Sequence, residues 1–230
     1  IFLIPVIILF NYRKNTKLIF LVFATTILII NFFYGSLILK NNKKINETNL
    51  NFVIKIISPK IDINRFFNDE NPAKIILELI KLSEPNNLEK AIFIFPEGVL
   101  SNIYLEDLKN YSYIFSENYS DQHKIVMGIN SSEEAKVFNS MVVLDQDVNI
   151  LAKYNKNKLV PFGEFLPFEK FFKKIGLRKI SYGYESFSTG NDRSLISLID
   201  KNFNFIPLIC YEIIYSGKIT SKFNDTNFII

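Results

Sequence analysis

The sequence contains no tryptophan, one histidine and one cysteine among its 230 residues. A single cysteine excludes a disulfide framework within the chain. One histidine and one cysteine together do not supply the ligands of an ordinary zinc site. The formal charge is only +4, and the lysines are scattered rather than arranged in a stripe. This charge pattern gives no electrostatic footprint for nucleic acid, so we expect neither a zinc site nor a nucleic-acid partner.

Apolar residues, by contrast, make up 48% of the chain, and one long run of them contains no charged residue. Residues 18–39 read LIFLVFATTILIINFFYGSLIL. A helix rises about 1.5 Å per residue, so this run crosses the roughly 30 Å hydrocarbon core of a bilayer. It is too long for a signal peptide, and no cleavage pattern of small residues follows it. The sequence therefore predicts a transmembrane helix at about 18–39.

A second apolar stretch precedes this helix and is joined to it by a short basic loop. Residues 1–10, IFLIPVIILF, are predicted to be the end of an earlier span, and the loop at 11–17 carries three basic residues. Short positive loops stay on the cytoplasmic side of a membrane. We therefore expect a membrane region at 1–40, with everything that follows on the outer side.

The remaining chain, 41–230, reads as a soluble domain in which short apolar runs alternate with polar turns. Strands are predicted at 51–58, 90–97 and 124–130, helices at 71–84 and 102–118, and hairpins at 140–156 and 194–212. Strands that alternate with helices, together with two hairpins, indicate an α/β layered fold with buried sheets. The chain begins with isoleucine and stops within a strand-like run, so we expect it to be a fragment of a longer protein.

Three residues with reactive side chains lie at the ends of predicted strands. Glu97 closes one strand, Lys156 follows the first hairpin, and the only cysteine, Cys210, closes another strand. Strand ends are where an α/β sheet presents groups to a ligand crevice. Each residue alone has a structural explanation, since free cysteine is commonly buried in a core. Lys156 likewise lies between Lys153 and Lys158, and its alternative interpretation is an ordinary solvent-exposed lysine.

Together, the three side chains supply what a thiol nucleophile needs. A free thiol is only a few per cent ionised at neutral pH, so it requires a base. A carboxylate can take the proton, and a lysine ammonium can stabilise both the thiolate and the oxyanion that its attack creates. The only histidine, His123, lies at a strand entrance, and we do not expect it to be the base. A cysteine enzyme built from this chain would use a carboxylate.

Three short motifs carry a resemblance to a known family. FPEG at 95–98, YNKNKLVPFGEFLPF at 154–168 and LICYEIIY at 208–215 resemble, in this order, the signatures of the nitrilase, or carbon–nitrogen hydrolase, superfamily. KLVPFGEFLP with ICYE downstream of membrane spans is specifically similar to the apolipoprotein N-acyltransferase family of bacterial inner membranes. FNS at 138–140 and FSTG at 187–190 also fit. The resemblance implies a nitrilase-like α-β-β-α sandwich, which this chain leaves incomplete at its C-terminal end.

The resemblance implies a role for each matching residue. Glu97 matches the general base, Cys210 the nucleophile, and Lys156 the catalytic lysine, which the family's spacing selects over its two lysine neighbours. Glu164 matches a second active-site glutamate that positions the lysine or assists proton transfer. Tyr211 and Glu212 match the residues after the nucleophile, and the Tyr211 backbone N–H is expected to help to bind the oxyanion.

The reaction that the resemblance implies is a two-step acyl transfer without a metal or cofactor. An acyl chain passes from a phospholipid to Cys210 and then to the N-terminal amine of a diacylglyceryl-modified apolipoprotein. The implied protein is a multi-pass inner-membrane enzyme, with its catalytic domain on the periplasmic side, and we expect a monomer. The alternatives are a membrane-tethered amidase-like hydrolase with water as acceptor, and a non-catalytic binding domain on the same scaffold.

One segment near these motifs has two interpretations. Residues 165–186, FLPFEKFFKKIGLRKISYGYES, are rich in aromatic and basic side chains. Such a segment beside a membrane-anchored site is suited to lie at the lipid interface and to gate the entry of acyl chains. The other interpretation is a short core helix at 167–176 with exposed lysines.

Overall fold

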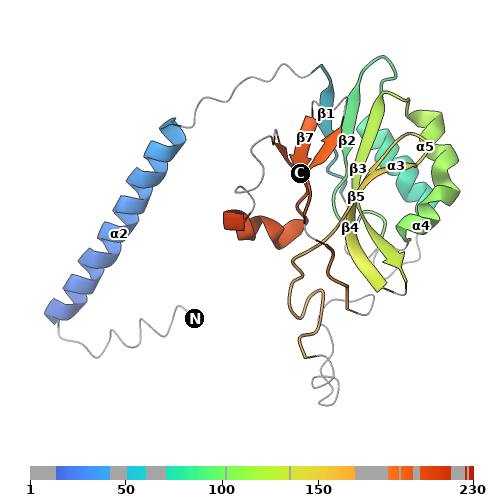
Figure 1. The fold of residues 1–230 in the computed structure, drawn as a ribbon. Helices are drawn as coiled ribbons and strands as arrows, with labels where there is room; N and C mark the ends of the chain where they lie inside the picture. The colour runs from blue at the N-terminus through green and yellow to red at the C-terminus, as the bar shows by residue number, and fades with distance from the viewer. Residues whose placement is uncertain are drawn as a thin grey trace. The chain divides into compact units, whose positions relative to one another are not determined.

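A computed structural model of the chain describes residues 14–41, 51–60, 71–101, 103–134, 136–168, 186–191, 193–198, 203–218, 226 and 228–230. The chain divides into two compact units, Ile1–Asn49 and Leu50–Ile230. Figure 1 shows the described elements of both units as a ribbon.

The described residues of the first unit form a long helix, α2 (Lys14–Asn41). Its stretch Lys14–Ile38 is long and apolar enough to cross a membrane, judged by length and composition, and none of it is buried within the structure. The hydroxyls of Thr25 and Thr26 donate to the carbonyl of Val22 at 2.9 and 2.8 Å, so these two polar groups are satisfied inside the helix. The predicted helix is confirmed as a helix and as a candidate membrane span.

The helix begins earlier than the sequence pattern indicated. Lys14 and Lys17 were expected in a loop at 11–17, but both lie in the first turns of α2. Lysine is a good helix former and no glycine or proline intervenes before residue 18, so the helix extends back over them. The predicted earlier span at 1–10 lies outside the described residues.

The second unit is built on a five-stranded sheet. Its strands are β1 (Val53–Ile56), β2 (Ala91–Ile94), β3 (His123–Glu133), β4 (Lys136–Leu144) and β5 (Ile150–Asn155), and they lie in this order. The first three strands are parallel, whereas β3, β4 and β5 are joined as antiparallel neighbours. The predicted strands and the first hairpin are therefore present.

Helices cover one face of this sheet (Figure 1). They are α3 (Pro72–Ser83), α4 (Leu105–Leu108), the 3-10 helix η2 (Lys109–Tyr111) and α5 (Ser112–Asn118). The sequence predicted one helix over 102–118, and the structure divides it into three short pieces. Asn110, Tyr111 and Ser112 are poor helix formers, which explains why the chain tightens into 3-10 geometry there. Buried side chains of these helices, such as Ile76 and Phe115, pack against Phe93 and Ile125 of the sheet.

The other face packs against a second, three-stranded sheet. This sheet has the order β6 (Ile196–Leu198), β7 (Phe203–Ile206), β8 (Phe228–Ile229), and β6 and β7 form the second predicted hairpin. Phe203 and Phe205 of β7 share a buried cluster with Ile92 and Val126 of the large sheet. One helix layer and two packed sheets agree with the predicted nitrilase-like α/β fold.

Strand β7 ends earlier than expected. Cys210 was predicted to close the strand, but β7 ends at Ile206 and Cys210 opens the 3-10 helix η3 (Cys210–Lys218). The next residue, Pro207, has no backbone N–H to donate to a sheet, so the strand ends there, although the Leu208 N–H still donates to the Ile230 carbonyl at 2.7 Å. The cysteine therefore lies on a turn that leaves the sheet.

Candidate active site

Lys156 follows β5 and has a buried side chain, with 1% of it exposed. Its Nζ lies 2.7 Å from Oε1 of Glu164. Its backbone is fixed on both sides, because its N–H donates to the Asn139 carbonyl at 2.8 Å and its carbonyl accepts from Gly190 N–H at 2.9 Å. A buried lysine requires a partner of opposite charge, and Glu164 provides it.

The two neighbouring lysines lie in different surroundings. Lys153 Nζ lies 2.6 Å from Oε1 of Glu133 at the surface, and Lys158 is exposed. Among these three lysines, the structure buries only Lys156 beside the second predicted glutamate.

Glu164 is held in a tight turn after the lysine. Its N–H donates to the Val160 carbonyl at 2.8 Å, and its Oε2 accepts from the Val160 N–H at 2.9 Å. Its carbonyl accepts from the N–H of Phe187, a residue of the FSTG motif, at 2.8 Å. Phe162, within the turn, has a left-handed φ of 63°. The carboxylate is thus aimed at Lys156 by its own backbone turn.

Glu97 joins this pair through an asparagine of β4. The side-chain amide of Asn139 donates to Oε1 of Glu97 at 2.6 Å and to Oε1 of Glu164 at 3.0 Å. Glu97, Asn139, Glu164 and Lys156 therefore form one continuous chain of contacts. The sequence analysis assigned no role to Asn139. The FNS motif, which contains this residue, was the signal that could have marked it as part of the site.

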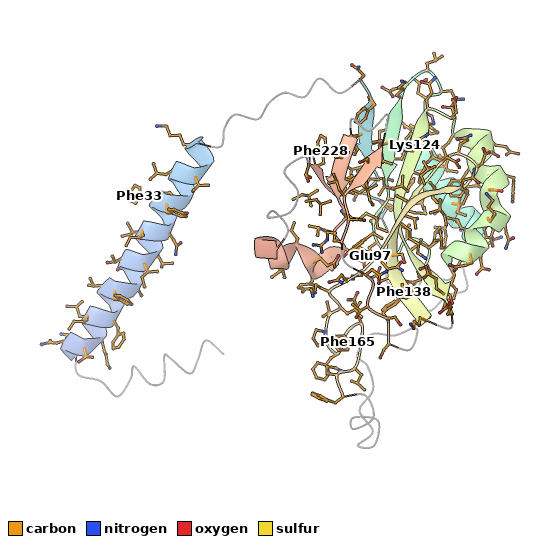
Figure 2. All side chains as sticks on the ribbon, viewed as in Figure 1. Phe33, Glu97, Lys124, Phe138, Phe165 and Phe228 are labelled. Carbon is orange, nitrogen blue, oxygen red and sulfur yellow. The ribbon has the colours of Figure 1, made fainter. Side chains whose placement is uncertain are left out.

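A glycine on the neighbouring strand allows Glu97 to reach this position. Glu97 lies in the turn after β2, and a Cβ placed on Gly128 of β3 would lie 2.7 Å from the Glu97 Cα. That separation is too short for two carbon atoms, so only glycine permits the approach. Figure 2 labels Glu97 within the second unit and Phe165, next to Glu164 in the chain, below it.

Cys210 is exposed and carries a free thiol. Its φ is +51°, a left-handed conformation that is uncommon for a residue with a side chain. Such outliers cluster at functional sites because the surrounding structure has to hold them in place. The thiol is not packed in the core as a small hydrophobe. Tyr211 follows with an exposed side chain.

Glu212, two residues after the cysteine, is completely buried. Its Oε1 accepts from Tyr154 Oη at 2.7 Å and from the N–H groups of Asn157 and Lys158 at 3.0 Å. Its Oε2 accepts from the Ile209 N–H at 3.0 Å. Burial, followed by the hydrogen bond to the Glu212 carboxylate, raises the pKa of Tyr154 to about 12. Glu212 thus joins the cysteine turn to the chain immediately after Lys156.

His123 has a structural role at the start of β3. It is fully buried, its Nδ1 accepts from the Ser120 N–H at 3.0 Å, and its Nε2 lies 3.1 Å from the carbonyls of Asn86 and Glu89. Its ring packs edge-on against Phe93. These contacts agree with the expectation that His123 is not the catalytic base. Within the described part of the chain, no group of three or more histidine, cysteine, aspartate or glutamate residues could hold a metal ion.

Comparison with known proteins finds a family that matches part of the chain. The carbon–nitrogen hydrolase family profile matches residues 112–221, a range that contains Lys156, Glu164 and Cys210. Over these residues the chain is similar to carbon–nitrogen hydrolases, and it has the nitrilase-like layered α/β fold described above.

Among curated proteins, the sequence is similar to apolipoprotein N-acyltransferases. The apolipoprotein N-acyltransferase of Rhizobium leguminosarum bv. trifolii is 31% identical over 77% of this chain and 35% of the relative. That of Brucella suis biovar 1 is 25% identical over 81% of this chain and 36% of the relative. The chain thus spans only about a third of the length of these curated relatives.

A solved amidase from Nesterenkonia sp. AN1, with an acetamide moiety added covalently at its active-site cysteine, is a more distant likeness. It has a TM-score of 0.41 and 14% identity, over 71% of this chain and 57% of that chain.

Proposed function

We propose that this chain forms the catalytic part of a membrane-bound N-acyltransferase. It moves a fatty acyl chain from a phospholipid to Cys210 and then to the N-terminal amine of a diacylglyceryl-modified apolipoprotein. The observation that carries the proposal is the buried Lys156–Glu164 pair, joined through Asn139 to Glu97. This network contains Glu97, Lys156 and Glu164, three residues that the resemblance assigned to one reaction. The chain is also similar to apolipoprotein N-acyltransferases.

In the first step, the Cys210 thiol gives its proton to the Glu97 carboxylate, and the thiolate attacks the ester carbonyl of the phospholipid. Lys156 Nζ and the Tyr211 N–H stabilise the oxyanion of the tetrahedral intermediate. The C–O bond breaks, and Glu97 returns the proton to the leaving lysophospholipid. The product is a thioester on Cys210.

In the second step, the amine of the acceptor cysteine attacks the thioester carbonyl. Glu97 takes a proton from the attacking nitrogen, the C–S bond breaks, and the proton passes to the departing thiolate of Cys210. An amide is formed and the enzyme returns to its starting state. Two substrates that visit one covalent intermediate in turn predict ping-pong kinetics.

The surroundings of the cysteine support a lipid substrate rather than a small amide. Helix η3 exposes Tyr211, Ile213 and Ile214, and the turn before Glu164 exposes Phe162. A cavity of about 140 Å³ lies beside the cysteine turn, lined by Lys158, Leu159, Val160, Pro161, Tyr211 and Ile214. Apolar side chains at the surface are suited to contact with acyl chains. The proposed gating segment lies largely outside the described residues, beyond Phe168.

The position in the cell follows from the same proposal. We infer a membrane region at 1–40, with α2 as its described span, and a catalytic domain at 41–230 on the periplasmic side of the inner membrane. The complete protein would be a multi-pass monomer whose partners are a phospholipid donor and an apolipoprotein acceptor.

The test uses the complete protein in membranes, with Cys210→Ser as the matched variant. Phosphatidylethanolamine with an alkyne-tagged acyl chain is supplied first, and a diacylglyceryl-cysteine peptide afterwards. We expect a hydroxylamine-sensitive label on the enzyme that requires Cys210 and then moves to the peptide amine. A label that is lost only to water would establish the hydrolase instead. No label at all would contradict both and leave a non-catalytic domain.

A further inference from the structure

The buried carboxylate of Glu212 links two parts of the site, the turn that carries Cys210 and the loop that follows Lys156. On one side it accepts from Ile209 N–H, immediately before the cysteine. On the other side it accepts from the N–H groups of Asn157 and Lys158, immediately after the catalytic lysine. Lys156 and Cys210 are far apart in the chain, so no short stretch of backbone fixes the distance between them. The position of Cys210 relative to Lys156 therefore depends on the Glu212 carboxylate.

A carboxylate without contact with water is costly unless a positive charge compensates it. Taking an ion out of water costs several kcal/mol even after relaxation. Tyr154 and the three backbone N–H groups supply dipoles only, and Lys158 contributes its N–H rather than its exposed ammonium. A cation beside this carboxylate compensates its buried charge.

Arg193 provides this cation. Its Nη2 lies 3.2 Å from Oε1 of Glu212, and only 13% of its side chain is exposed. The guanidinium carbon lies 5.7 Å from the centroid of the Tyr154 ring, within the range of a cation–π contact. The side chain is thus confined between the carboxylate and the ring that also donates to that carboxylate.

The residues just before Arg193 are hydrogen-bonded to Lys156 and Asn157. Gly190 donates its N–H to the Lys156 carbonyl at 2.9 Å, and the Asn157 amide donates to the carbonyls of Gly190 and Asn191 at 3.0 and 3.2 Å. A Cβ on Gly190 would overlap the Asn155 carbonyl oxygen, so the two backbone segments approach more closely than any residue but glycine allows. These contacts fix where the arginine enters the site.

We propose that Arg193 is a positioning residue for the nucleophile, because its guanidinium compensates the buried charge of Glu212, which joins the cysteine turn to the lysine loop. This inference rests on the proposed function, since it takes Cys210 as the nucleophile. Without the cation, the carboxylate loses its compensation, and its hydrogen bonds to Ile209 and Asn157 weaken together. The thiol then moves relative to Lys156 and Glu97, although neither of these residues has changed.

The experiment measures kcat and KM for acyl transfer from phosphatidylethanolamine to a diacylglyceryl-cysteine peptide, with the complete protein in membranes. Arg193→Met removes the charge and keeps a stem of similar length. We expect kcat to fall roughly tenfold to a hundredfold with KM little changed, because misplacing a reacting group by about 1 Å costs about a hundredfold. Arg193→Lys should recover most of the loss, which a role in packing alone would not predict.

Two further variants separate positioning from other effects. In a Glu212→Gln background, Arg193→Met should add no further loss, because the residue acts through that carboxylate. Lys153→Met is the matched control. It removes a lysine of β5 that pairs with Glu133 of β3 at the surface, and it should keep the wild-type kcat. Losses of Arg193→Met and Glu212→Gln that multiply would overturn the proposal, as would a wild-type kcat in Arg193→Met.

Folding is followed in parallel by thermal unfolding of each variant. If Arg193→Met does not fold, Arg193→Gln replaces it, and the same comparison with Arg193→Lys applies. If neither uncharged variant folds while Arg193→Lys does, the arginine serves folding and the proposal is overturned. An unmodified protein that never acylates Cys210 would refute the proposed function and this inference with it. Normal acylation that Arg193→Met leaves unchanged would refute this inference alone.

Discussion

Two ion pairs three residues apart differ in almost everything except their geometry. Lys153 pairs with Glu133 at 2.6 Å and Lys156 pairs with Glu164 at 2.7 Å. The exposed fractions of the two side chains are 19% and 52% in the first pair, but 1% and 15% in the second. Water screens the first pair, so it contributes little, whereas the second is desolvated and depends on its partners. Burial, rather than distance, thus separates an ordinary surface contact from a site that can bind developing charge.

The largest expected effect comes from removing the buried cation. Lys156→Met should lower the rate of acylation of Cys210 about a hundredfold to a thousandfold, because an oxyanion donor in a desolvated site contributes this much. The rate of label incorporation from tagged phospholipid measures it. The double variant Lys156→Met/Glu164→Gln removes the whole pair, so it should unfold at a temperature closer to wild type while staying inactive. An acylation rate within threefold of wild type would show that Lys156 is not in the site.

The next effect concerns the amide that bridges the two glutamates. Asn139→Leu keeps the volume of the side chain but leaves Glu97 and Glu164 without their shared donor. We expect the acylation rate to fall roughly tenfold to a hundredfold, since the base is no longer held in place. The matched control is Ser140→Ala on the same strand, which bonds to Ser131 and Asn155 away from Glu97. Equal losses in both variants would mean that β4 is merely sensitive to substitution.

A smaller effect is expected at the close contact behind Glu97. Gly128→Ala places a Cβ 2.7 Å from the Glu97 Cα, so the turn after β2 has to shift. We predict a loss of about 1–3 kcal/mol in the free energy of unfolding, the usual cost of overpacking, together with reduced acylation. Denaturant unfolding and label incorporation measure the two quantities. Gly163→Ala, whose Cβ would meet Val160 atoms at 3.5 Å and beyond, is the control and should change the stability less.

The smallest effect belongs to the surface pair and disappears in acid. The hydrogen bond from Lys153 and then its charge hold the pKa of Glu133 below its usual value. A lowered pKa in the folded state adds stability above the pKa of the unfolded chain, near 4.3, and this stability is lost as the pH falls through the folded value.

Lys153→Met should therefore lower the melting temperature slightly at pH 7 and not at pH 3. The expected loss is within about 1 kcal/mol, because the pair is exposed and screened. Glu133→Gln serves as the control and should give the same pH dependence. A Lys153→Met variant that loses acylation activity would contradict the distinction between the two pairs.

Much of the molecule could be predicted from local sequence, because the signals were themselves local. The alternating and continuous apolar runs gave the strands and hairpins, and Asn71 followed by Pro72 marked the start of α3, where the asparagine caps the helix. The motifs pointed to Lys156 rather than its neighbours, and in the structure this lysine is the buried one. By contrast, the end of β7 was misplaced, although Pro207 was visible in the sequence.

The remaining features depend on contacts between distant parts of the chain. Asn139 lies in the middle of a strand and reaches two glutamates that precede and follow it by many residues, a pattern without a local signature. Arg193 lies in a loop and looks like a solvated cation until the fold buries it against Glu212. The burial of a charge is a property of the packed layers, and short-range spacing does not encode it.

We propose that the buried Lys156–Glu164 pair, and not the surface Lys153–Glu133 pair, is required for a thioester to form on Cys210. The most direct measurement is the mass of the peptide that contains Cys210, after the complete protein has been incubated with phospholipid and without an acceptor. We predict an acyl adduct on this peptide in the wild type and in Lys153→Met, and little or none in Lys156→Met. An adduct of equal abundance in all three proteins, or no adduct on Cys210 in any of them, would contradict the claim.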